Sequence, residues 1–409
     1  MNDMSVRFAG DDSVTLRRYP FLVRQALGLA RRIETGTLAV TMPDGALLRF
    51  GGLLPGPAAE IMLRSYNFAN RLAAEGELGI AEAYLQGEWD SPNLTAVTEI
   101  FSRNHAVIEK LLRGRPLTRL WQLFGHWRNR NTKSGAKRNI AAHYDLGNSF
   151  YAAWLDSSMT YSSALFENGA QDLGTGQQAK YRRLARETGI GPADQVLEIG
   201  CGWGGFAEFA ARDIGCHVTA LTISQAQHDF ARERIFKAGL NDRVEIKLQD
   251  YRDARGAYDK IASIEMFEAV GETFWASYFS QLHGLLKPGG VAGLQVITIK
   301  EILFAPYKRE MDFIRRYIFP GGMLPTLSIL RDMGAKHGVP MKLQVNFGAD
   351  YARTLVEWRN RFRAAWPALT GLGFDDRFRR MWEYYLAYCE GGFRSGQIDV
   401  RQMVFAKSG

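Results

Sequence analysis

From residue 190 onward, β-prone runs alternate with runs of helical spacing, and this alternation constrains the fold more than any other feature. Helices are predicted over 206–214, 225–238 and 273–286, and the last of them meets the stop signal Lys287-Pro288-Gly289-Gly290. Strands joined by helices pair in parallel, so we expect an α/β fold with a doubly wound parallel sheet. The predicted strands are QVLEIG (195–200), HVTALTI (217–223), RVEIKL (243–248), KIASIE (260–265) and VAGLQVITI (291–299).

The residues that precede this region have the pattern of a small α+β domain. TGTLAVTMPDGALLRF (35–50) places two alternating β-prone runs around a Pro-Asp-Gly turn, which predicts a β-hairpin. Helices are predicted over 58–72 and 77–86, and the loop after them offers Asp90 or Ser91 as a helix cap. We therefore expect an N-terminal domain over 1–125, a basic linker over 126–142 and the α/β domain over 143–409.

Composition excludes several classes of protein. Hydrophobic residues make up 46% of the chain and charged residues 23%, as in an ordinary globular protein. No apolar run approaches the roughly 18 residues that span a bilayer, and the first residues, MNDMSVRFAGDDS, lack the apolar region of a secretory signal. Three scattered cysteines favour reduced thiols in a cytoplasm, and the scattered histidines show no metal-ligand spacing. We expect a cytoplasmic protein without a metal.

The formal net charge of +8 is concentrated in one stretch. Ten basic residues and one acidic residue, Glu109, lie between Arg103 and Arg138. Such a stretch favours an anionic partner, either nucleic acid or an anionic membrane surface. The sequence from 105 to 127 mixes Leu, Ile, Trp and Phe with basic residues, which is typical of an interfacial helix and also of an ordinary core-facing helix. No nucleic-acid-binding motif accompanies it, so we expect no nucleic acid.

A glycine-rich turn follows the first predicted strand of the α/β region. Its glycines Gly200, Gly202 and Gly205 match the dinucleotide pattern G-x-G-x-x-G. However, the acidic residue Glu198 precedes the glycines, and the second strand ends in Leu-Thr-Ile-Ser (221–224) without an acid for a ribose. The spacing E-x-G-x-G-x-G resembles the cofactor loop of class I S-adenosylmethionine methyltransferases. A tight turn with packing glycines is the alternative.

The chain as a whole resembles the cyclopropane-fatty-acyl-phospholipid synthase family, which includes the mycolic acid cyclopropane synthases. The resemblance covers nearly the whole chain, including GEWDSPNLTA in the N-terminal domain. It implies a class I methyltransferase fold, Rossmann-like, in the α/β domain. The segments that carry it are AHYDLGNSFYAAWLDSSMTYSSALF (142–166), VLEIGCGWGG (196–205), LTISQAQ (221–227), LQDYRD (248–253), MFEAVG (266–271), YIFPGGMLP (317–325), NFGADY (346–351) and GQIDVRQMVF (396–405).

The resemblance assigns the S-adenosylmethionine site to residues in these segments. Tyr161 and Ser162 would contact the carboxylate or amine of the cofactor. The glycine turn would follow its methionine part, the end of the second strand its ribose, and the segment after the third strand its adenine. The implied cofactor-binding residues are Tyr161, Ser162, Glu198, Gly200, Gly202, Gly204, Thr222, Ile223, Gln227, Asp250 and Tyr251.

The resemblance also implies a bicarbonate ion that acts as a base and closes a cyclopropane ring. Glu268, Ile297 and Tyr351 match three of its ligands. The two others depart from the pattern, because Ser163 replaces a Cys and Gln295 replaces a His. Glutamine still donates a hydrogen bond to an anion but does not carry a proton near neutral pH. Loss of a different proton would instead give a methyl-branched unsaturated chain, and both products stay open.

The implied substrate is the cis double bond of an unsaturated acyl chain in membrane phospholipid. We therefore expect a C-methyltransferase that is peripheral on the inner membrane face, at an anionic surface. Residues 307–319, YKREMDFIRRYIF, follow the fifth strand, where a lid over the acyl chain would lie. The family also implies a homodimer. A non-catalytic homologue that binds lipid or cofactor is the remaining alternative, since the base site is altered.

Overall fold

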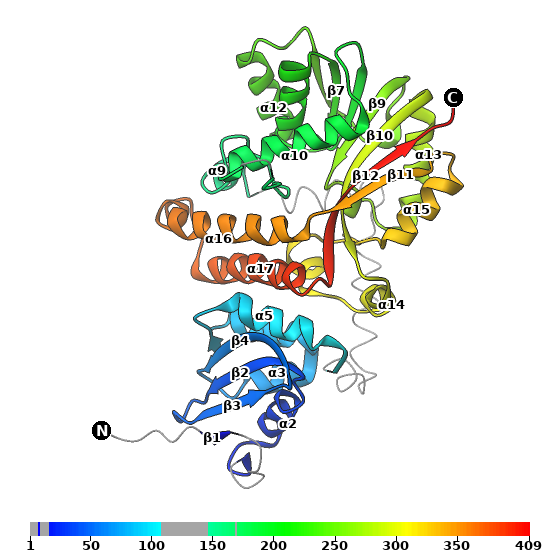
Figure 1. Cartoon of the computed structure of the whole chain (residues 1–409). Coiled ribbons are helices and arrows are strands. Elements are labelled where there is room, and N and C mark those ends of the chain that lie inside the picture. Colours follow the sequence, from blue (N-terminus) through cyan, green and yellow to red (C-terminus); the bar gives the residue numbers. More distant parts are fainter. Residues whose placement is uncertain (1–6, 9–15, 108–145, 168–169) are drawn as a thin grey trace. The chain divides into compact units, whose positions relative to one another are not determined.

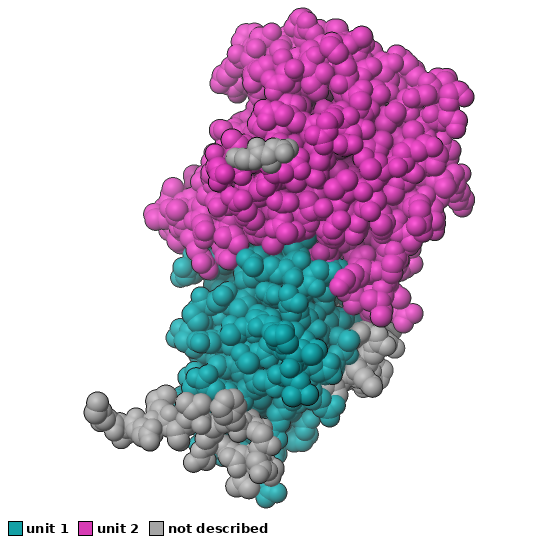
Figure 2. Space-filling model, in the orientation of Figure 1, with its two compact units in different colours: residues 1–125, 310–313, 373–397 teal, residues 126–309, 314–372, 398–409 magenta. Residues whose placement is uncertain are grey.

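The computed structural model describes residues 7–8, 16–107, 146–167 and 170–409 (Figure 1). The linker over 126–142 and most of the basic stretch lie outside the described residues, as does most of 105–127. The chain forms two compact units, which Figure 2 shows in different colours. Unit 1 comprises residues 1–125, 310–313 and 373–397, and unit 2 comprises residues 126–309, 314–372 and 398–409. The predicted domains are continuous in sequence, whereas the compact units are not.

Unit 1 is built on a five-stranded sheet of order β1-β3-β2-β4-β5. The predicted hairpin is confirmed, because β2 and β3 pair antiparallel. The predicted helix over 58–72 is wrong in its first part, since residues 58–63 belong to strand β4, parallel to β2, and only 68–72 are helical, in α3. Ala59, Ile61 and Leu63 are buried at every second position, so the period is that of a strand. The strands are β1 (Arg7–Phe8), β2 (Thr35–Thr41), β3 (Leu47–Gly51), β4 (Leu54–Leu63) and β5 (Trp89–Asp90).

The helices of unit 1 include one that arrives from the far end of the sequence. Helix α17 (Asp376–Arg394) packs on α5 (Leu94–Arg103). The approach is close, because a Cβ at Gly391 would lie 2.5 Å from Thr98 Oγ1. Asn93, and not the predicted Asp90 or Ser91, caps α5 by accepting a hydrogen bond from the Ala96 amide. The other helices are α2 (Phe21–Ala30), α3 (Phe68–Glu75) and α4 (Glu77–Leu85), the last close to its predicted bounds.

Unit 2 contains the predicted doubly wound sheet, with seven strands in the order β11-β12-β10-β9-β6-β7-β8. The five predicted strands pair in parallel, as expected. Two further strands extend the sheet, β12 antiparallel to β10 and β11 antiparallel to β12. The strands are β6 (Gln195–Ile199), β7 (His217–Thr222), β8 (Val244–Leu248), β9 (Tyr258–Ile264), β10 (Leu286–Ile299), β11 (Met341–Asn346) and β12 (Ile398–Ala406).

Helices cover both faces of this sheet. Successive residues of a strand point to opposite faces, so two neighbours on β6 contact different sets of helices. Val196 packs in the cluster that contains α10, α11 and α12, and Leu197 in the cluster that contains α13 and α15. No helix within the described ranges combines the length and hydropathy that a membrane crossing requires. The helices are α9 (Asn148–Ala152), α10 (Leu173–Thr188), α11 (Gly205–Phe209), α12 (Gln225–Lys237), α13 (Trp275–Leu285), α14 (Glu301–Arg309), α15 (Leu327–Lys336) and α16 (Gly348–Gly371).

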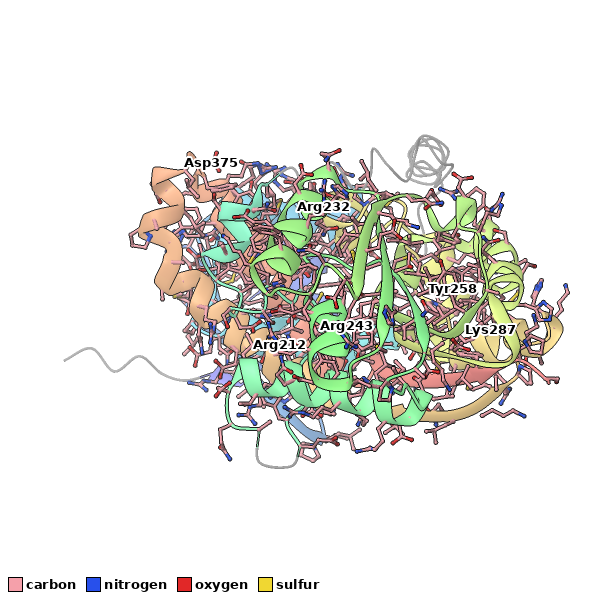
Figure 3. All side chains as sticks on the ribbon, turned by 90° about the horizontal axis from the view of Figure 1, so that it is seen from above. Arg212, Arg232, Arg243, Tyr258, Lys287 and Asp375 are labelled. Carbon is pink, nitrogen blue, oxygen red and sulfur yellow. The ribbon has the colours of Figure 1, made fainter. Side chains whose placement is uncertain are left out.

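An ion pair marks the edge of the sheet where β9 and β10 begin. Lys287 Nζ lies 2.8 Å from Asp259 Oδ1, close to Tyr258, and Figure 3 labels Lys287 and Tyr258 on this side. The predicted stop signal after α13 therefore lies inside β10, where a shift in register accommodates it. The carboxyl ends of the parallel strands, at the opposite edge, hold the residues that the sequence assigns to the site.

Candidate functional site

The glycine turn after β6 brings bare backbone to the carboxyl end of the sheet. The amides of Gly200 and Cys201 both donate to Leu221 O on β7, at 3.0 and 2.8 Å, which fixes the turn. Gly200 has φ 84°, and a Cβ there would lie 2.6 Å from Met266 Cγ. Gly202 also has positive φ, 53°, but a Cβ there would meet nothing within 4 Å. The turn therefore requires glycine and leaves open space beside Gly202 for a ligand.

Glu198 lies on β6, immediately before this turn, and is only 2% exposed. Burial raises the pKa of its carboxyl to about 8, although an amide hydrogen bond from Ala207 and the nearby Lys180 cation act in the opposite direction. Its Oε2 atom is buried without a hydrogen-bond partner among the described residues. A buried carboxylate oxygen of this kind suits the ammonium group of S-adenosylmethionine. Together with the space at Gly202, it makes the turn a fitting site for this cofactor.

The predicted ribose and adenine residues follow β7 and β8. Thr222 and Gln227 are buried and meet each other, with 2.9 Å between Thr222 Oγ1 and Gln227 Oε1. Ile223 follows Thr222, the last residue of β7. Asp250 forms an ion pair with Arg252, with 2.5 Å between Arg252 Nη2 and Asp250 Oδ2. The Tyr251 ring packs against another tyrosine, and burial raises its pKa to about 12. The structure thus places the predicted ribose and adenine residues at the carboxyl ends of the parallel strands.

The predicted base site centres on a residue that the sequence analysis did not select, Glu265, directly after β9. Its Oε1 atom accepts hydrogen bonds from the Ser163 amide at 2.9 Å and from Gln295 Nε2 at 2.7 Å. Its Oε2 atom accepts a hydrogen bond from the Tyr351 hydroxyl at 2.7 Å. Three of the five predicted catalytic residues therefore converge on one carboxylate.

Further contacts hold the donors around Glu265 in place. Gln402 Nε2 donates to Gln295 Oε1 at 3.1 Å, so the other end of the Gln295 amide, Nε2, faces Glu265. Thr354 Oγ1 accepts a hydrogen bond from the Ala164 amide, and this contact ties the segment of Ser163 to helix α16. Gln295 and Ser163 are fully buried and Tyr351 is 6% exposed. These donors form a rigid pocket for a carboxylate.

The two other predicted catalytic residues, Glu268 and Ile297, bind each other. The Ile297 amide donates to Glu268 Oε1 at 2.5 Å, and Glu268 Oε2 is buried without a partner among the described residues. Burial and, after it, the charge of Glu265 raise the pKa of Glu268 to about 8. Glu268 is therefore largely protonated at neutral pH.

A buried lysine lies behind the site. Lys180 on α10 is fully buried, and its Nζ donates to Ser162 Oγ at 2.6 Å. Burial lowers its pKa to about 7, while the carboxylates of Glu265, Asp156 and Glu198 favour its charged form. For Glu265, burial raises the pKa, and the Lys180 cation is the first of four contacts that lower it again. Lys180 therefore favours the carboxylate form of Glu265.

Aromatic rings surround the predicted cofactor residue Tyr161. Its ring centroid lies 5.2 Å from Trp358, 5.4 Å from Tyr151, 5.7 Å from Trp154 and 6.5 Å from Phe319. Trp358 and Tyr351 are seven residues apart, on one side of α16, and their rings are 6.1 Å apart and perpendicular. Because Tyr351 also contacts Glu265, the aromatic cluster adjoins the carboxylate. Such rings stabilise positive charge.

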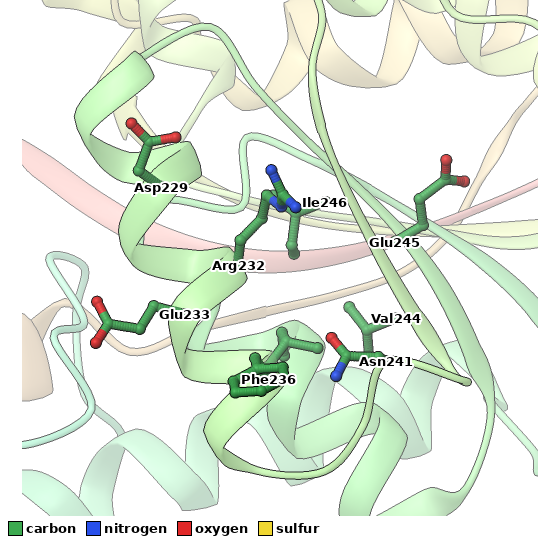
Figure 4. Close-up of a pocket in the computed structure, with 9 residues that line it drawn as sticks. Asp229, Arg232, Glu233, Phe236, Asn241, Val244, Glu245 and Ile246 are labelled. Carbon is green, nitrogen blue, oxygen red and sulfur yellow. The ribbon is translucent and has the colours of Figure 1, made fainter.

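Other features of unit 2 lie apart from this chemistry. The pocket in Figure 4 is lined by residues of α12 and β8, such as Arg232 and Glu245, and by none of the predicted site residues. Burial raises the pKa of the Cys201 thiol well above its ordinary value, so this cysteine is a poor nucleophile. Within the described part of the chain, no group of three or more His, Cys, Asp or Glu side chains is arranged to hold a metal ion.

Glu265, Lys180 and Trp358 are the functional candidates that sequence reasoning missed. Glu265 ends the run KIASIE, where it counts as the last residue of a strand. Its backbone has φ 49°, an unusual value for a residue other than glycine. The available signal is a second glutamate, three residues before Glu268, at the carboxyl end of a parallel strand. Lys180 and Trp358 lie in helices whose periodicity gives no such signal.

Comparison with known proteins places this site in a family. The sequence profile of the mycolic acid cyclopropane synthetase family matches residues 131–403. Tuberculostearic acid methyltransferase UfaA1 of Mycobacterium tuberculosis is 40% identical over 351 residues, which cover 83% of this chain and 81% of that protein. Cyclopropane-fatty-acyl-phospholipid synthase of Escherichia coli K12 is 36% identical over 365 residues, which cover 88% and 91%.

Solved structures agree with this comparison. Cyclopropane synthase MmaA2 of Mycobacterium tuberculosis superposes with a TM-score of 0.62 at 29% identity, covering 66% of this chain and 98% of that protein. Mycolic acid cyclopropane synthase CmaA1, complexed with SAH and CTAB, has the same TM-score, the same identity and the same coverage of both chains. This chain belongs to the mycolic acid cyclopropane synthetase family of S-adenosylmethionine-dependent methyltransferases.

Proposed function

We propose that this protein transfers a methyl group from S-adenosylmethionine to the cis double bond of an unsaturated acyl chain in membrane phospholipid. The observation that carries the proposal is the aromatic cluster around Tyr161 and Trp358. This cluster adjoins the hydrogen-bonded carboxylate of Glu265, and the glycine turn at Gly202 has space for the cofactor. The relatives support the same substrate class, since one is named a cyclopropane-fatty-acyl-phospholipid synthase and another a tuberculostearic acid methyltransferase.

The residues of the site suit the demands of this reaction. S-adenosylmethionine, when bound, supplies a methyl group on a positively charged sulfur, and an alkene attacks it with its π electrons. Glu198 and the backbone at Gly202 would hold the cofactor at the end of β6. The rings of Tyr161, Trp358 and Tyr351 then shelter the positive charge that develops on the acyl chain, and they exclude water from it. A base must finally remove one proton from the chain.

The second candidate product is a methyl-branched unsaturated chain, formed without ring closure. Gln295 favours it, because an amide in place of the imidazole removes a group that titrates near neutral pH. The relative named tuberculostearic acid methyltransferase supports it as well. Formation of a cyclopropane remains the first candidate, supported by the synthase from Escherichia coli.

We also propose an anionic membrane surface as the place of action, on the inner face of the membrane. The ten basic residues between Arg103 and Arg138 support such a partner, because each adds attraction to anionic lipid. The same proposal includes two further expectations: residues 307–319 form a lid over the acyl chain, and the protein is a homodimer. Binding to anionic liposomes should weaken as salt is raised, whereas a surface without this role would show no salt dependence.

The test uses the full chain, S-adenosylmethionine with a trideuterated methyl group, and liposomes of monounsaturated phosphatidylglycerol. Mass spectrometry of the released acyl chains should show the gain of one labelled methylene or methyl unit. A cyclopropane retains two deuterium atoms, because the third leaves the transferred methyl when the ring closes, whereas a branched chain that loses a proton from a carbon of the acyl chain retains all three. If the cofactor binds and no acyl chain gains mass, the protein is a non-catalytic lipid- or cofactor-binding homologue and the proposal fails.

A further inference from the structure

The carboxylate of Glu265 occupies the centre of the site that the family resemblance assigns to bicarbonate. Ser163, Gln295 and Tyr351 occupy three of the five positions that the resemblance assigns to bicarbonate ligands, and each donates a hydrogen bond to Glu265. A carboxylate and a bicarbonate ion present the same planar pair of oxygens to such donors. The side chain therefore satisfies the donors that would otherwise hold the ion.

The two remaining ligands of the implied ion are engaged as well. Glu268 Oε1 accepts the Ile297 amide, so these two residues satisfy each other without an ion between them. The site also holds a second carboxyl group beside Glu265, since the charge of Glu265 acts on Glu268. A bicarbonate ion would add a further negative charge here, which like-charge repulsion disfavours.

The backbone of Glu265 indicates that its side chain has a role. The residue has φ 49°, a conformation that is unfavourable for a residue other than glycine. Its amide donates to Gln295 O at 2.8 Å, so pairing with β10 fixes this conformation. The residue remains partly exposed, although all three of its donors are buried. Oε2 accepts a single hydrogen bond, from Tyr351, so it keeps a lone pair that can take a proton.

We infer that Glu265 is the built-in general base of this enzyme and takes the place of bicarbonate. The inference rests on the proposed function. After methyl transfer, a C–H bond of the cationic acyl chain breaks, and its electron pair forms the ring bond or the new double bond. The proton forms an O–H bond with a carboxylate oxygen of Glu265 and passes to water after the product leaves. The positive charge of the chain is thereby removed, and the carboxylate is regenerated.

The experiment compares wild type, Glu265→Gly and Glu265→Gln in buffer depleted of carbon dioxide. Glycine suits the positive φ and leaves a vacancy lined by the three donors. Glutamine fills the same space without a base. Wild type should methylate acyl chains at an unchanged rate when bicarbonate is added. Both variants should lose about 100-fold or more in rate, the usual contribution of a general base. Bicarbonate or formate should restore Glu265→Gly at least about tenfold and should leave Glu265→Gln inactive.

Two measurements that do not depend on turnover complete the test. Calorimetry should give similar S-adenosylmethionine affinities for all three proteins, within about threefold, which shows that the variants are folded. Carbon-13 NMR of labelled bicarbonate should show line broadening with Glu265→Gly and none with wild type. If Glu265→Gly does not fold, the wild-type bicarbonate response and the Glu265→Gln rate still decide the question.

Several results would overturn the inference. One is a wild-type rate that depends on added bicarbonate, and another is a Glu265→Gln variant that keeps the wild-type rate. A folded Glu265→Gly that neither binds bicarbonate nor responds to it would show that the vacancy is not an anion site. Each of these results leaves acyl methylation by wild type intact, so it is distinct from failure of the proposed function, in which wild type adds no mass to any acyl chain.

Discussion

Replacing Glu268 with Gln should remove one component of the pH dependence of stability. The Glu268 carboxyl has one oxygen bound by the Ile297 amide and one buried oxygen without a partner among the described residues. Burial, followed by the charge of Glu265, raises its pKa from 4.5 to about 8. In the unfolded chain the group ionises above its ordinary pKa, whereas in the folded chain it stays protonated up to about 8.

The sign and size of the effect follow from proton linkage. Between these two pKa values the folded state binds one more proton than the unfolded state, so stability falls as pH rises. The loss is about 1.4 kcal/mol per pH unit, or about 3 kcal/mol between pH 5 and pH 7. The stabilisation is complete below pH 4.5 and is lost as pH rises through 8. Glutamine has no ionisation, and its amide oxygen still accepts the Ile297 amide.

The assay is urea unfolding of wild type and Glu268→Gln at several pH values from 5 to 8. The free energy of unfolding of the variant, minus that of wild type, should increase by about 3 kcal/mol between pH 5 and pH 7 and by about 1 kcal/mol more up to pH 8. Glu233→Gln is the matched control, because Glu233 is a carboxylate on α12 with 63% of its side chain exposed. Its difference from wild type should stay flat. A flat difference for Glu268→Gln as well would mean that Glu268 is ionised in the folded protein, and would refute the reasoning.

Two further predictions concern the cofactor turn and the buried cation. Gly202→Ala should weaken S-adenosylmethionine binding by more than about tenfold in calorimetry, because the added Cβ enters the open space beside the turn. Gly239→Ala has a similar positive φ with nothing nearby, so it should lose about 1 kcal/mol of stability and bind the cofactor normally; equal affinities for the two variants would contradict the assignment of the turn. Lys180→Met should move the acidic limb of the rate profile to higher pH, because a cation that favours the Glu265 carboxylate is removed. Lys180→Arg should move it less, and an unchanged limb in Lys180→Met would show that the two groups are not coupled.

The five parallel strands of unit 2 can be predicted from sequence periodicity, whereas β4, β11 and the placement of α17 cannot. Strand β4 reads as a helix because Ala58, Ala59, Glu60 and Met62 are good helix formers, yet its pairing with β2 decides the outcome. Strand β11 is also hidden, since its residues are largely exposed and lack a buried alternation. Helix α17 joins unit 1 through contacts with α5, nearly 300 residues earlier, which no local pattern reveals. Local patterns thus predict local pairing better than long-range assembly.

The candidate site shows the same division. The glycine turn is visible locally, because only its backbone conformation and an adjacent acid are needed. Ser163, Gln295 and Tyr351 come from three distant segments, and only family resemblance selects them together. Their common partner, Glu265, is absent from that set. The resemblance names the residues that bind the ion in the family, and it does not name a side chain that occupies the place of the ion. Three-dimensional contacts were therefore necessary to find it.

Charge balance links Glu265 to the rest of the site. Glu265 and Glu268 are two neighbouring carboxyl groups, and Glu268 remains protonated to about pH 8, so the pair holds at most about one negative charge at neutral pH. Lys180, whose pKa is about 7, favours the charged form of Glu265. Ionised Glu265 alone therefore supplies the single negative charge that the proposed substrate cation needs. An additional bicarbonate ion would require another cation or another proton, and the donors that would hold it are already bonded to Glu265. Proton removal by a side chain therefore fits both the hydrogen bonds and the charge of this site better than removal by a bound ion.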